Sequence, residues 1–247
     1  MLAGVRCVSE SPFGSWHGAA EAVCVFVDRL MADDAGQINM MAADVAAGPG
    51  GRLAMLDFFI AATQQMGAMW EQDLCDFTTL TLAVYRLTRI IASTSPTAAG
   101  ADGRRILLFA APGEPHGFGL AIVAEVFRED GWSVSRLSSA KRRQLTALVK
   151  DEWFDVIGVS ITLESCLHGL PSCIREICRA SCNPAPLVMV GGGAVVTHPE
   201  RLRFLGADAT AANAPDALRR ANLFMETEVT RRIHQFKTKT DDIRLAL

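Results

Sequence analysis

One histidine of the chain lies in a loop between residues that break helices. In the segment LLFAAPGEPHGFGLAIVAEVF, residues 107–127, His116 stands between Pro115 and Gly117, and Glu114 precedes it by two residues. An imidazole binds a metal through one ring nitrogen, and a carboxylate bonded to the other nitrogen fixes the tautomer and raises the basicity of the ligand. We therefore interpret His116 as a candidate metal ligand oriented by Glu114. The alternative is a solvent-facing loop histidine without a role.

The glycines of this loop exclude two phosphate-binding motifs. Gly113, Gly117 and Gly119 lack the spacing Gly-x-Gly-x-x-Gly of the dinucleotide-binding fingerprint. The loop also lacks the Lys-Ser/Thr end of a P-loop. Nucleotide binding therefore does not explain it.

Two further loops carry residues that suit a ligand site. Ser160 and Thr162 follow one short apolar segment, and the glycines 191–193 follow another. Ligands of open parallel sheets bind outside the carboxyl ends of the strands. We expect both loops to meet the His116 loop in space, although the three are far apart in the sequence.

The elements that must position these loops alternate between strand and helix patterns. Strands are predicted at residues 104–112, 132–137, 155–161, 186–193 and 207–211, and helices at 117–131, 140–152, 162–180, 198–206 and 214–236. Pro171 is expected to loosen the third of these helices. Such alternation indicates βαβ crossovers and a parallel sheet with both faces covered. The predicted fold class is α/β, with a parallel, Rossmann-like (flavodoxin-like) sheet preceded by a small helical bundle.

The first hundred residues carry helical patterns and almost no strand patterns. Helices are predicted at residues 15–34, 35–47 and 52–94, the last of them broken near Gly67. The small, polar segment 94–103 reads as a linker. We therefore predict a helical domain over residues 1–97, a sheet domain over 98–236, and a charged, frayed tail over 237–247.

The three loops together resemble the signature of cobalamin-binding domains. Glu114-x-His116-x-x-Gly119, then Ser160-x-Thr162, then Gly191-Gly192 follow the family pattern Asp-x-His-x-x-Gly, Ser-x-Leu and Gly-Gly. The gaps between the loops also fit the family, and the resemblance covers about residues 104–224. Two positions depart from the pattern, because Glu114 replaces Asp and Thr162 replaces Leu.

The resemblance implies a cofactor, cobalamin, bound with its dimethylbenzimidazole tail swung away from cobalt. His116 would then be the lower axial ligand and Glu114 its relay partner. Gly119 would let the tail pass the first helix, and the Ser160 hydroxyl would bond a nitrogen of the tail. The remaining cofactor-binding residues expected from the three loops are Gly117, Phe118, Thr162, Gly191, Gly192 and Gly193.

Helical bundles that precede such domains usually cap the upper face of the cofactor. Relatives carry a Trp followed by Glu-His on the cap, and Trp70 matches the Trp, whereas Leu80 and Thr81 occupy the place of Glu-His. Trp70 is therefore expected at the cofactor, with an ordinary core aromatic as the alternative. We expect His17 to be an upper axial ligand or contact. That ligand would favour hydroxo- or aquocobalamin over the adenosyl and methyl forms.

Composition excludes several functions. The chain has 247 residues, a formal net charge of −3 and a hydrophobic fraction of 50%. This balance argues against non-specific binding of nucleic acid, and no apolar run is long enough to span a membrane. We read the protein as cytoplasmic. The seven cysteines, four of which cluster between Cys166 and Cys182 around His168, lack a Cys-x-x-Cys pair and are expected to pack in the core rather than to bind a metal.

The layout of a short helical part and a cobalamin domain looks most like the PpaA/AerR regulators of photosynthesis genes. The resemblance implies a protein that is not an enzyme and that responds to light or redox state. It would act as an antirepressor on a DNA-bound repressor and contact DNA only indirectly or weakly. The alternatives are a corrinoid methyl carrier of a methyltransferase system and a haem-binding sensor of the same fold. The basic clusters at residues 141–144 and 230–239 are expected to be solvated.

Overall fold

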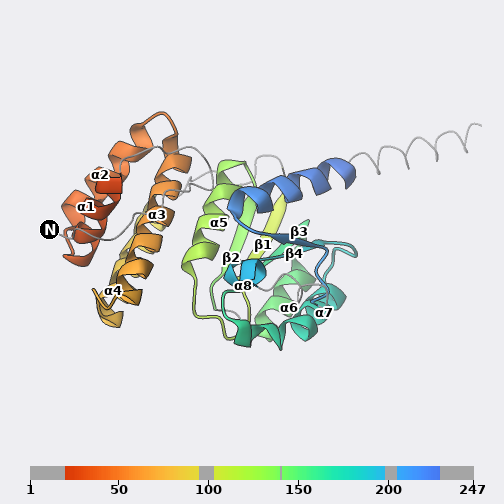
Figure 1. The fold of residues 1–247 in the computed structure, drawn as a ribbon. Coiled ribbons are helices and arrows are strands. Elements are labelled where there is room, and N and C mark those ends of the chain that lie inside the picture. The colour runs from red at the N-terminus through yellow and green to blue at the C-terminus, as the bar shows by residue number, and fades with distance from the viewer. Residues whose placement is uncertain (1–19, 95–102, 140, 198–204, 229–247) are drawn as a thin grey trace, which may run out of the picture. The chain divides into compact units, whose positions relative to one another are not determined.

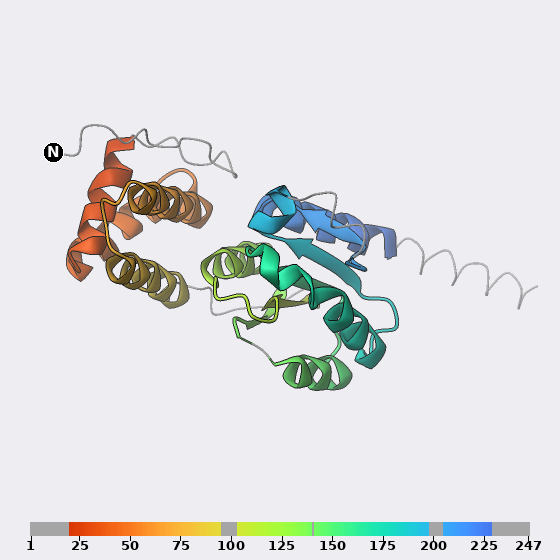
Figure 2. The same ribbon diagram turned by 60° about the horizontal axis from the view of Figure 1, so that its bottom comes forward.

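The periodic apolar residues of the first part of the chain fold as helices. In α1 (Ala20–Met31), the side chains of Val23, Phe26, Val27 and Leu30 repeat every three or four residues and are all buried. Three further helices follow, α2 (Ala35–Ala47), α3 (Gly51–Glu71) and α4 (Phe77–Ser93). The computed structural model describes residues 20–94, 103–139, 141–197 and 205–228, and these four helices belong to the first of its two units, Met1–Thr97 (Figures 1 and 2).

Aspartate caps and aromatic packing set the shape of this helical unit. The carboxylate of Asp34 accepts a hydrogen bond from Gln37 N at 3.2 Å, and that of Asp76 accepts one from Thr79 N at 2.9 Å. At the centre the ring of Phe26 lies 4.7 Å from that of Phe58, measured between centroids. Helix starts are thus fixed locally, and the helices are held together by burial of large aromatic side chains.

The predicted break at Gly67 is wrong. Helix α3 continues through Gly67 to Glu71, and the chain turns afterwards, where Asp73 has a φ of 56° and Asp76 caps α4. A glycine inside a helix costs only about 1 kcal/mol. Burial of the neighbouring Met66 and Met69 side chains exceeds that cost.

The second unit, Ala98–Leu247, is built on a parallel sheet of strand order β2-β1-β3-β4-β5. Its strands are β1 (Arg105–Ala110), β2 (Ser133–Leu137), β3 (Val156–Ser160), β4 (Leu187–Gly191) and β5 (Ala209–Ala211). Its helices are α5 (Phe118–Glu129), α6 (Arg142–Asp151), a short 3-10 turn η1 (Glu164–Leu167), α7 (Leu170–Ala180), α8 (Gly193–Thr197) and a last helix described over residues 214–228. The predicted fold class is confirmed.

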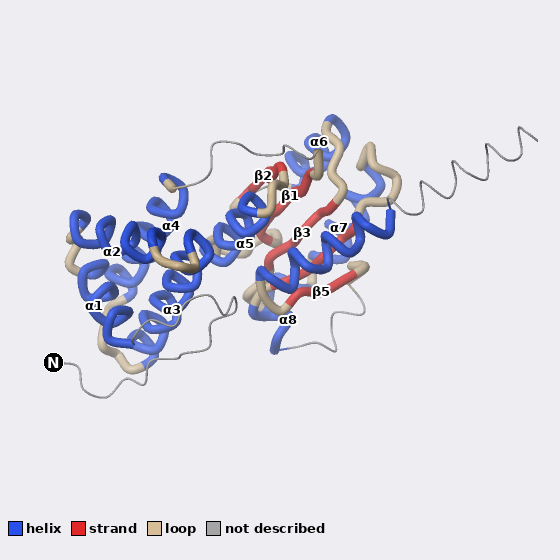
Figure 3. Tube along the Cα trace, turned by 90° about the horizontal axis from the view of Figure 1, so that it is seen from above, coloured by secondary structure: helices blue, strands red, loops and turns tan. Residues whose placement is uncertain are grey.

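Both faces of the sheet are covered, as the apolar strands require. Leu107, Phe109 and Ile157 point to one face and pack with buried residues of α6 and α7. Ile106 and Leu108 point to the other and pack with α5 and the last helix. The three layers are visible in Figure 3, where the strands lie between helices.

Two element boundaries differ from the prediction. Strand β4 ends at Gly191 and α8 begins at Gly193, inside the segment predicted to be strand. The predicted helix 162–180 is divided into η1 and α7, with Pro171 in the first turn of α7, where its missing N–H costs nothing. The predicted tail, 237–247, lies outside the described residues.

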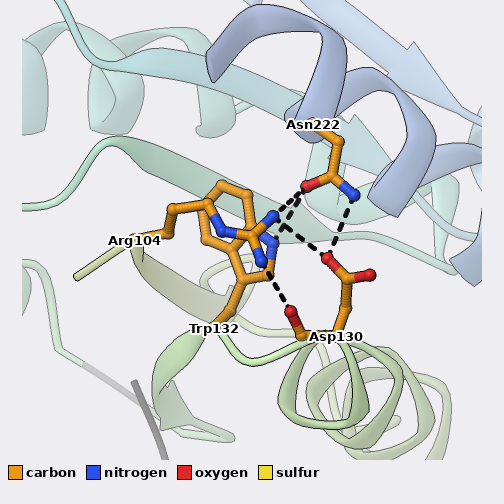
Figure 4. Close-up of polar contacts among 4 residues, drawn as sticks. All are labelled: Arg104, Asp130, Trp132 and Asn222. Atoms are coloured by element: carbon orange, nitrogen blue, oxygen red, sulfur yellow. Dashed lines mark hydrogen bonds and ion pairs between the residues drawn. The ribbon is translucent and has the colours of Figure 1, made fainter. Parts of the chain in front are cut away.

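A polar network fastens the last helix to the amino-terminal edge of the sheet (Figure 4). The guanidinium of Arg104 donates to Asp130 Oδ2 at 3.0 Å and to Asn222 Oδ1 at 2.6 Å. Asn222 in turn donates to Asp130, and the indole N–H of Trp132 donates to Asn222 Oδ1 at 3.1 Å. Arg104 also lies over the fully buried Trp132 ring, 4.9 Å from its centroid. The network therefore ties together residues from both ends of the sheet unit, at the edge opposite the predicted site.

None of the described helices has the length and apolar character that crossing a membrane requires.

Candidate cofactor-binding site

The loop after β1 presents Glu114 and His116 at the carboxyl edge of the sheet. Ala111 N donates to Ser160 O at 2.9 Å, which continues the strand ladder for one residue. Glu114 N then donates to Ala111 O at 2.9 Å, closing a turn in which Gly113 has a φ of 87°. That backbone conformation favours glycine. The turn brings Glu114 back toward the strand end.

The Glu114 carboxylate joins the loops after β1 and β3. Its Oε1 accepts a hydrogen bond from His116 N at 3.1 Å and lies 2.5 Å from His116 Nδ1. Its Oε2 accepts hydrogen bonds from Thr162 N at 2.7 Å and Leu163 N at 2.8 Å. The side chain is fully buried, so four polar contacts replace the water that the carboxylate loses on folding. Glutamate, one methylene longer than the family's Asp, here spans two loops.

These contacts keep Glu114 ionised. Burial raises the pKa of Glu114, but hydrogen bonds from Leu163 N, Thr162 N, His116 N and the His116 ring outweigh burial, and the pKa lies below its ordinary value. An ionised carboxylate only accepts hydrogen bonds. His116 Nδ1 must therefore carry a proton and donate it to Glu114.

In the neutral tautomer that has its proton on Nδ1, Nε2 of His116 keeps its lone pair. The His116 side chain is 55% exposed, whereas its partner Glu114 is not exposed at all. One ring nitrogen is thus fixed inside the protein and the other is available to a metal outside the sheet edge. This is the chemistry of an oriented histidine ligand.

The sheet register brings the Ser160 and glycine loops to the same edge. Ser160 is opposite Ala110 on one side and Gly191 on the other. Ser160 is half-buried, and Thr162 is exposed next to it. A Cβ atom on Gly193 would lie 3.5 Å from Thr162 Cγ2, so the loops after β3 and β4 are in contact. The three loops singled out in the sequence therefore meet.

The fold itself requires glycine at position 192 and leaves little room for a side chain at position 191. Gly192 has a φ of 110°, and a Cβ there would lie 2.4 Å from Ile161 O. A Cβ on Gly191 would lie 3.1 Å from Ala211 O of the neighbouring strand. Close approach of backbone, in addition to any ligand, explains both glycines.

Comparison with known proteins identifies this arrangement. Residues 104–221 match the family model of the B12 binding domain. These residues form a B12-binding domain. The match includes every residue of the three loops and also β1 to β5.

One relative in sequence and one solved structure extend the comparison. An uncharacterized 20.5 kDa protein in the bchF-crtJ intergenic region of Rhodobacter capsulatus is 29% identical over 156 residues, which cover 60% of this chain and 79% of that protein. The monomethylamine corrinoid protein of Methanosarcina barkeri has a TM-score of 0.65 at 16% sequence identity, covering 81% of this chain and 97% of that chain. The second likeness shows a shared fold.

The start of α5 in the B12-binding domain is open beside His116. Gly117 precedes the helix, and Phe118, its first residue, is half-buried. A Cβ on Gly119 would meet no protein atom within 4 Å. Among the described residues, the space within 4 Å of this position is thus open.

Sequence reasoning missed one residue at this edge. Ser138 follows β2, and a Cβ on Gly117 would lie 3.7 Å from Ser138 Cβ and 3.9 Å from its Oγ. The available signal was its position directly after a predicted strand, because strand ends converge at the same edge.

The residues expected on the upper face do not belong to the B12-binding domain. Trp70 lies near the C-terminus of α3 in the helical unit. Its side chain is 51% exposed, so the alternative interpretation of Trp70 as a core aromatic is wrong. Leu80 and Thr81 lie on α4, and the Thr81 hydroxyl donates to Phe77 O at 2.7 Å. Neither side chain is a cobalt ligand. His17 lies outside the described residues.

Two cysteines of the predicted cluster pack in the core of the sheet unit. Cys166 and Cys173 are buried in the core beneath the sheet, and burial raises the pKa of the Cys173 thiol. Within the described part of the chain, no group of three or more His, Cys, Asp or Glu side chains could hold a metal ion.

Proposed function

We propose that the chain binds cobalamin with its tail displaced and with His116 Nε2 as the lower axial ligand of cobalt. The observation that carries this proposal is the buried Glu114 carboxylate, which fixes Nδ1 of an exposed histidine at the edge where the B12-binding domain presents its signature loops. Bound cobalamin would supply a cobalt centre whose upper position responds to light, redox state or methyl donors. The hydroxo or aquo form is the one we expect, with His17 as its upper ligand or contact.

The other loop residues suit the tail. Gly119 leaves the space beside α5 open, and Ser160 stands half-buried at the end of the central strand β3. In this proposal Gly119 admits the tail, and the Ser160 hydroxyl donates a hydrogen bond to it. Gly191 and Gly192, which lack side chains, make room for the tail and its phosphate.

Absorption spectra of the protein with hydroxocobalamin test the ligand assignment. The wild type is expected to give the spectrum of histidine-ligated cobalamin, and His116→Ala is expected to lose it and to bind at least tenfold more weakly, because a coordinate bond is removed. His168→Ala is the matched control, since His168 is an exposed histidine outside the three loops. An unchanged spectrum of His116→Ala would remove the proposal. A Soret band in the purified protein would instead favour haem.

We further propose that cobalamin makes this chain a regulator of photosynthesis genes, acting as an antirepressor on a DNA-bound repressor. Support comes from the relative, whose gene lies in the bchF-crtJ intergenic region. The net charge of −3 also supports a role without base readout, because sequence-independent DNA affinity needs phosphate neutralisation by basic residues. The partner is therefore a protein, and DNA is contacted indirectly or weakly.

A corrinoid methyl carrier is the second candidate, and the shared fold with the monomethylamine corrinoid protein favours it. A genetic complementation experiment distinguishes the two candidate functions. In Rhodobacter capsulatus lacking its own 20.5 kDa relative, the wild-type chain and His168→Ala should restore photosynthesis-gene expression, and His116→Ala should not. Failure of the wild type, together with ready reduction and methylation of the bound cobalt in vitro, would favour the carrier.

A further inference from the structure

The loop after β2 stands beside the His116 loop. Strand β2 pairs in parallel with β1, and Leu137, its last residue, is opposite Phe109. Ser138, the next residue, lies beside Gly117, because a Cβ built on that glycine would be 3.7 Å from Ser138 Cβ. Gly117 follows His116 in the chain, so Ser138 lies near the loop that carries the proposed cobalt ligand.

The Ser138 side chain is free to bind a ligand. It is exposed, and within the described part of the chain its hydroxyl makes no hydrogen bond. A hydroxyl both donates and accepts, so it can pair with either atom of a carboxamide. A corrin ring carries several carboxamide side chains on its rim, and a ring held by His116 extends over the residues around that histidine.

We propose that Ser138 is a specificity-determining residue that hydrogen-bonds a carboxamide on the rim of the corrin ring. This inference rests on the proposed function, because it needs a corrinoid at His116. It assigns the β2 loop to the ring, whereas Gly119 and Ser160 are assigned to the tail. Ser138 would thus fix the rotation of the ring about the cobalt–His116 bond.

Binding of two ligands separates these roles. Hydroxocobalamin carries the tail, and cobinamide is the same ring without it. Ser138→Ala is expected to weaken both ligands by the same factor, about fivefold, as for the loss of one hydrogen bond. Ser133→Ala is the matched control, because Ser133 begins the same strand at the opposite edge of the sheet. Ser160→Ala is expected to weaken hydroxocobalamin and to leave cobinamide unchanged.

The binding results distinguish the role of Ser138 from the proposed binding of cobalamin at His116. If Ser138→Ala binds both ligands as tightly as the wild type, while His116→Ala loses affinity as expected, only the role of Ser138 is overturned. A loss for hydroxocobalamin only would place Ser138 at the tail and overturn the assignment to the ring. A wild type that binds neither ligand would overturn both proposals.

Discussion

Glu114 holds the site together because each of its oxygens accepts two hydrogen bonds inside the protein. Oε1 faces His116 N and Nδ1, and Oε2 faces Thr162 N and Leu163 N. An amide in its place would direct an NH₂ group at two N–H donors. We expect Glu114→Gln to lower the free energy of unfolding by about 2–3 kcal/mol, the cost of buried donors left unpaired. Urea unfolding without cofactor measures it.

The same residue gives a pH dependence with a defined sign. Because the pKa of Glu114 in the folded protein lies below its ordinary value, its stabilisation is complete at neutral pH and is lost as the pH falls through the lowered pKa. Glu114→Gln has no such charge to lose. The stability difference between wild type and variant should therefore shrink in acid, and a constant difference would contradict the role given to the carboxylate.

Gly192 and Gly119 lie at the same sheet edge for different physical reasons. Substitution of each by alanine should therefore change the stability of the protein in opposite directions. A Cβ on Gly192 would lie 2.4 Å from a backbone oxygen, and its φ is 110°, so Gly192→Ala is expected to cost about 2–4 kcal/mol. Gly119 lies in a helix with open space around it, so Gly119→Ala is expected to stabilise the free protein by about 0.5 kcal/mol. Urea unfolding of both variants tests this.

Cofactor binding tests the role of Gly119 separately from its effect on stability. If the cofactor tail passes Gly119, Gly119→Ala should weaken hydroxocobalamin while leaving cobinamide unaffected. Equal binding of hydroxocobalamin by wild type and Gly119→Ala would show that the tail takes another path.

At the scale of elements, the sequence predicted the order of strands and helices and the sheet edge at which the three loops meet. The strand–helix alternation and the rule that strand ends converge placed Glu114, Ser160 and the glycine loop at one edge, and the register confirms that they meet. The bonds from Glu114 to Thr162 N and Leu163 N were beyond prediction, because they depend on how two loops distant in sequence settle. The helix break was misplaced because burial around Gly67 outweighs its propensity.

At the scale of the molecule, the helical unit carries an exposed apolar surface. Between the end of α3 and the middle of α4, five large apolar side chains are at least 45% exposed: Trp70, Leu74, Phe77, Leu82 and Tyr85. Exposed apolar side chains mark a binding face where they form a contiguous patch. By resemblance to cobalamin-binding proteins this unit would be a cap over the cofactor, and that role stays a prediction.

A cap couples the two units thermodynamically, and calorimetry detects the coupling. A ligand bound only by the sheet unit stabilises that unit alone, by about 2.7 kcal/mol at a concentration one hundred times the Kd. A ligand also held by the helical unit stabilises both. We expect hydroxocobalamin to raise the unfolding temperature of both units in the full chain. In Trp70→Ala it should raise that of the sheet unit only. Because Trp70 is half exposed, the variant should unfold like the wild type without ligand. A shift confined to the sheet unit in the wild type would mean that the upper face is covered by something other than these helices.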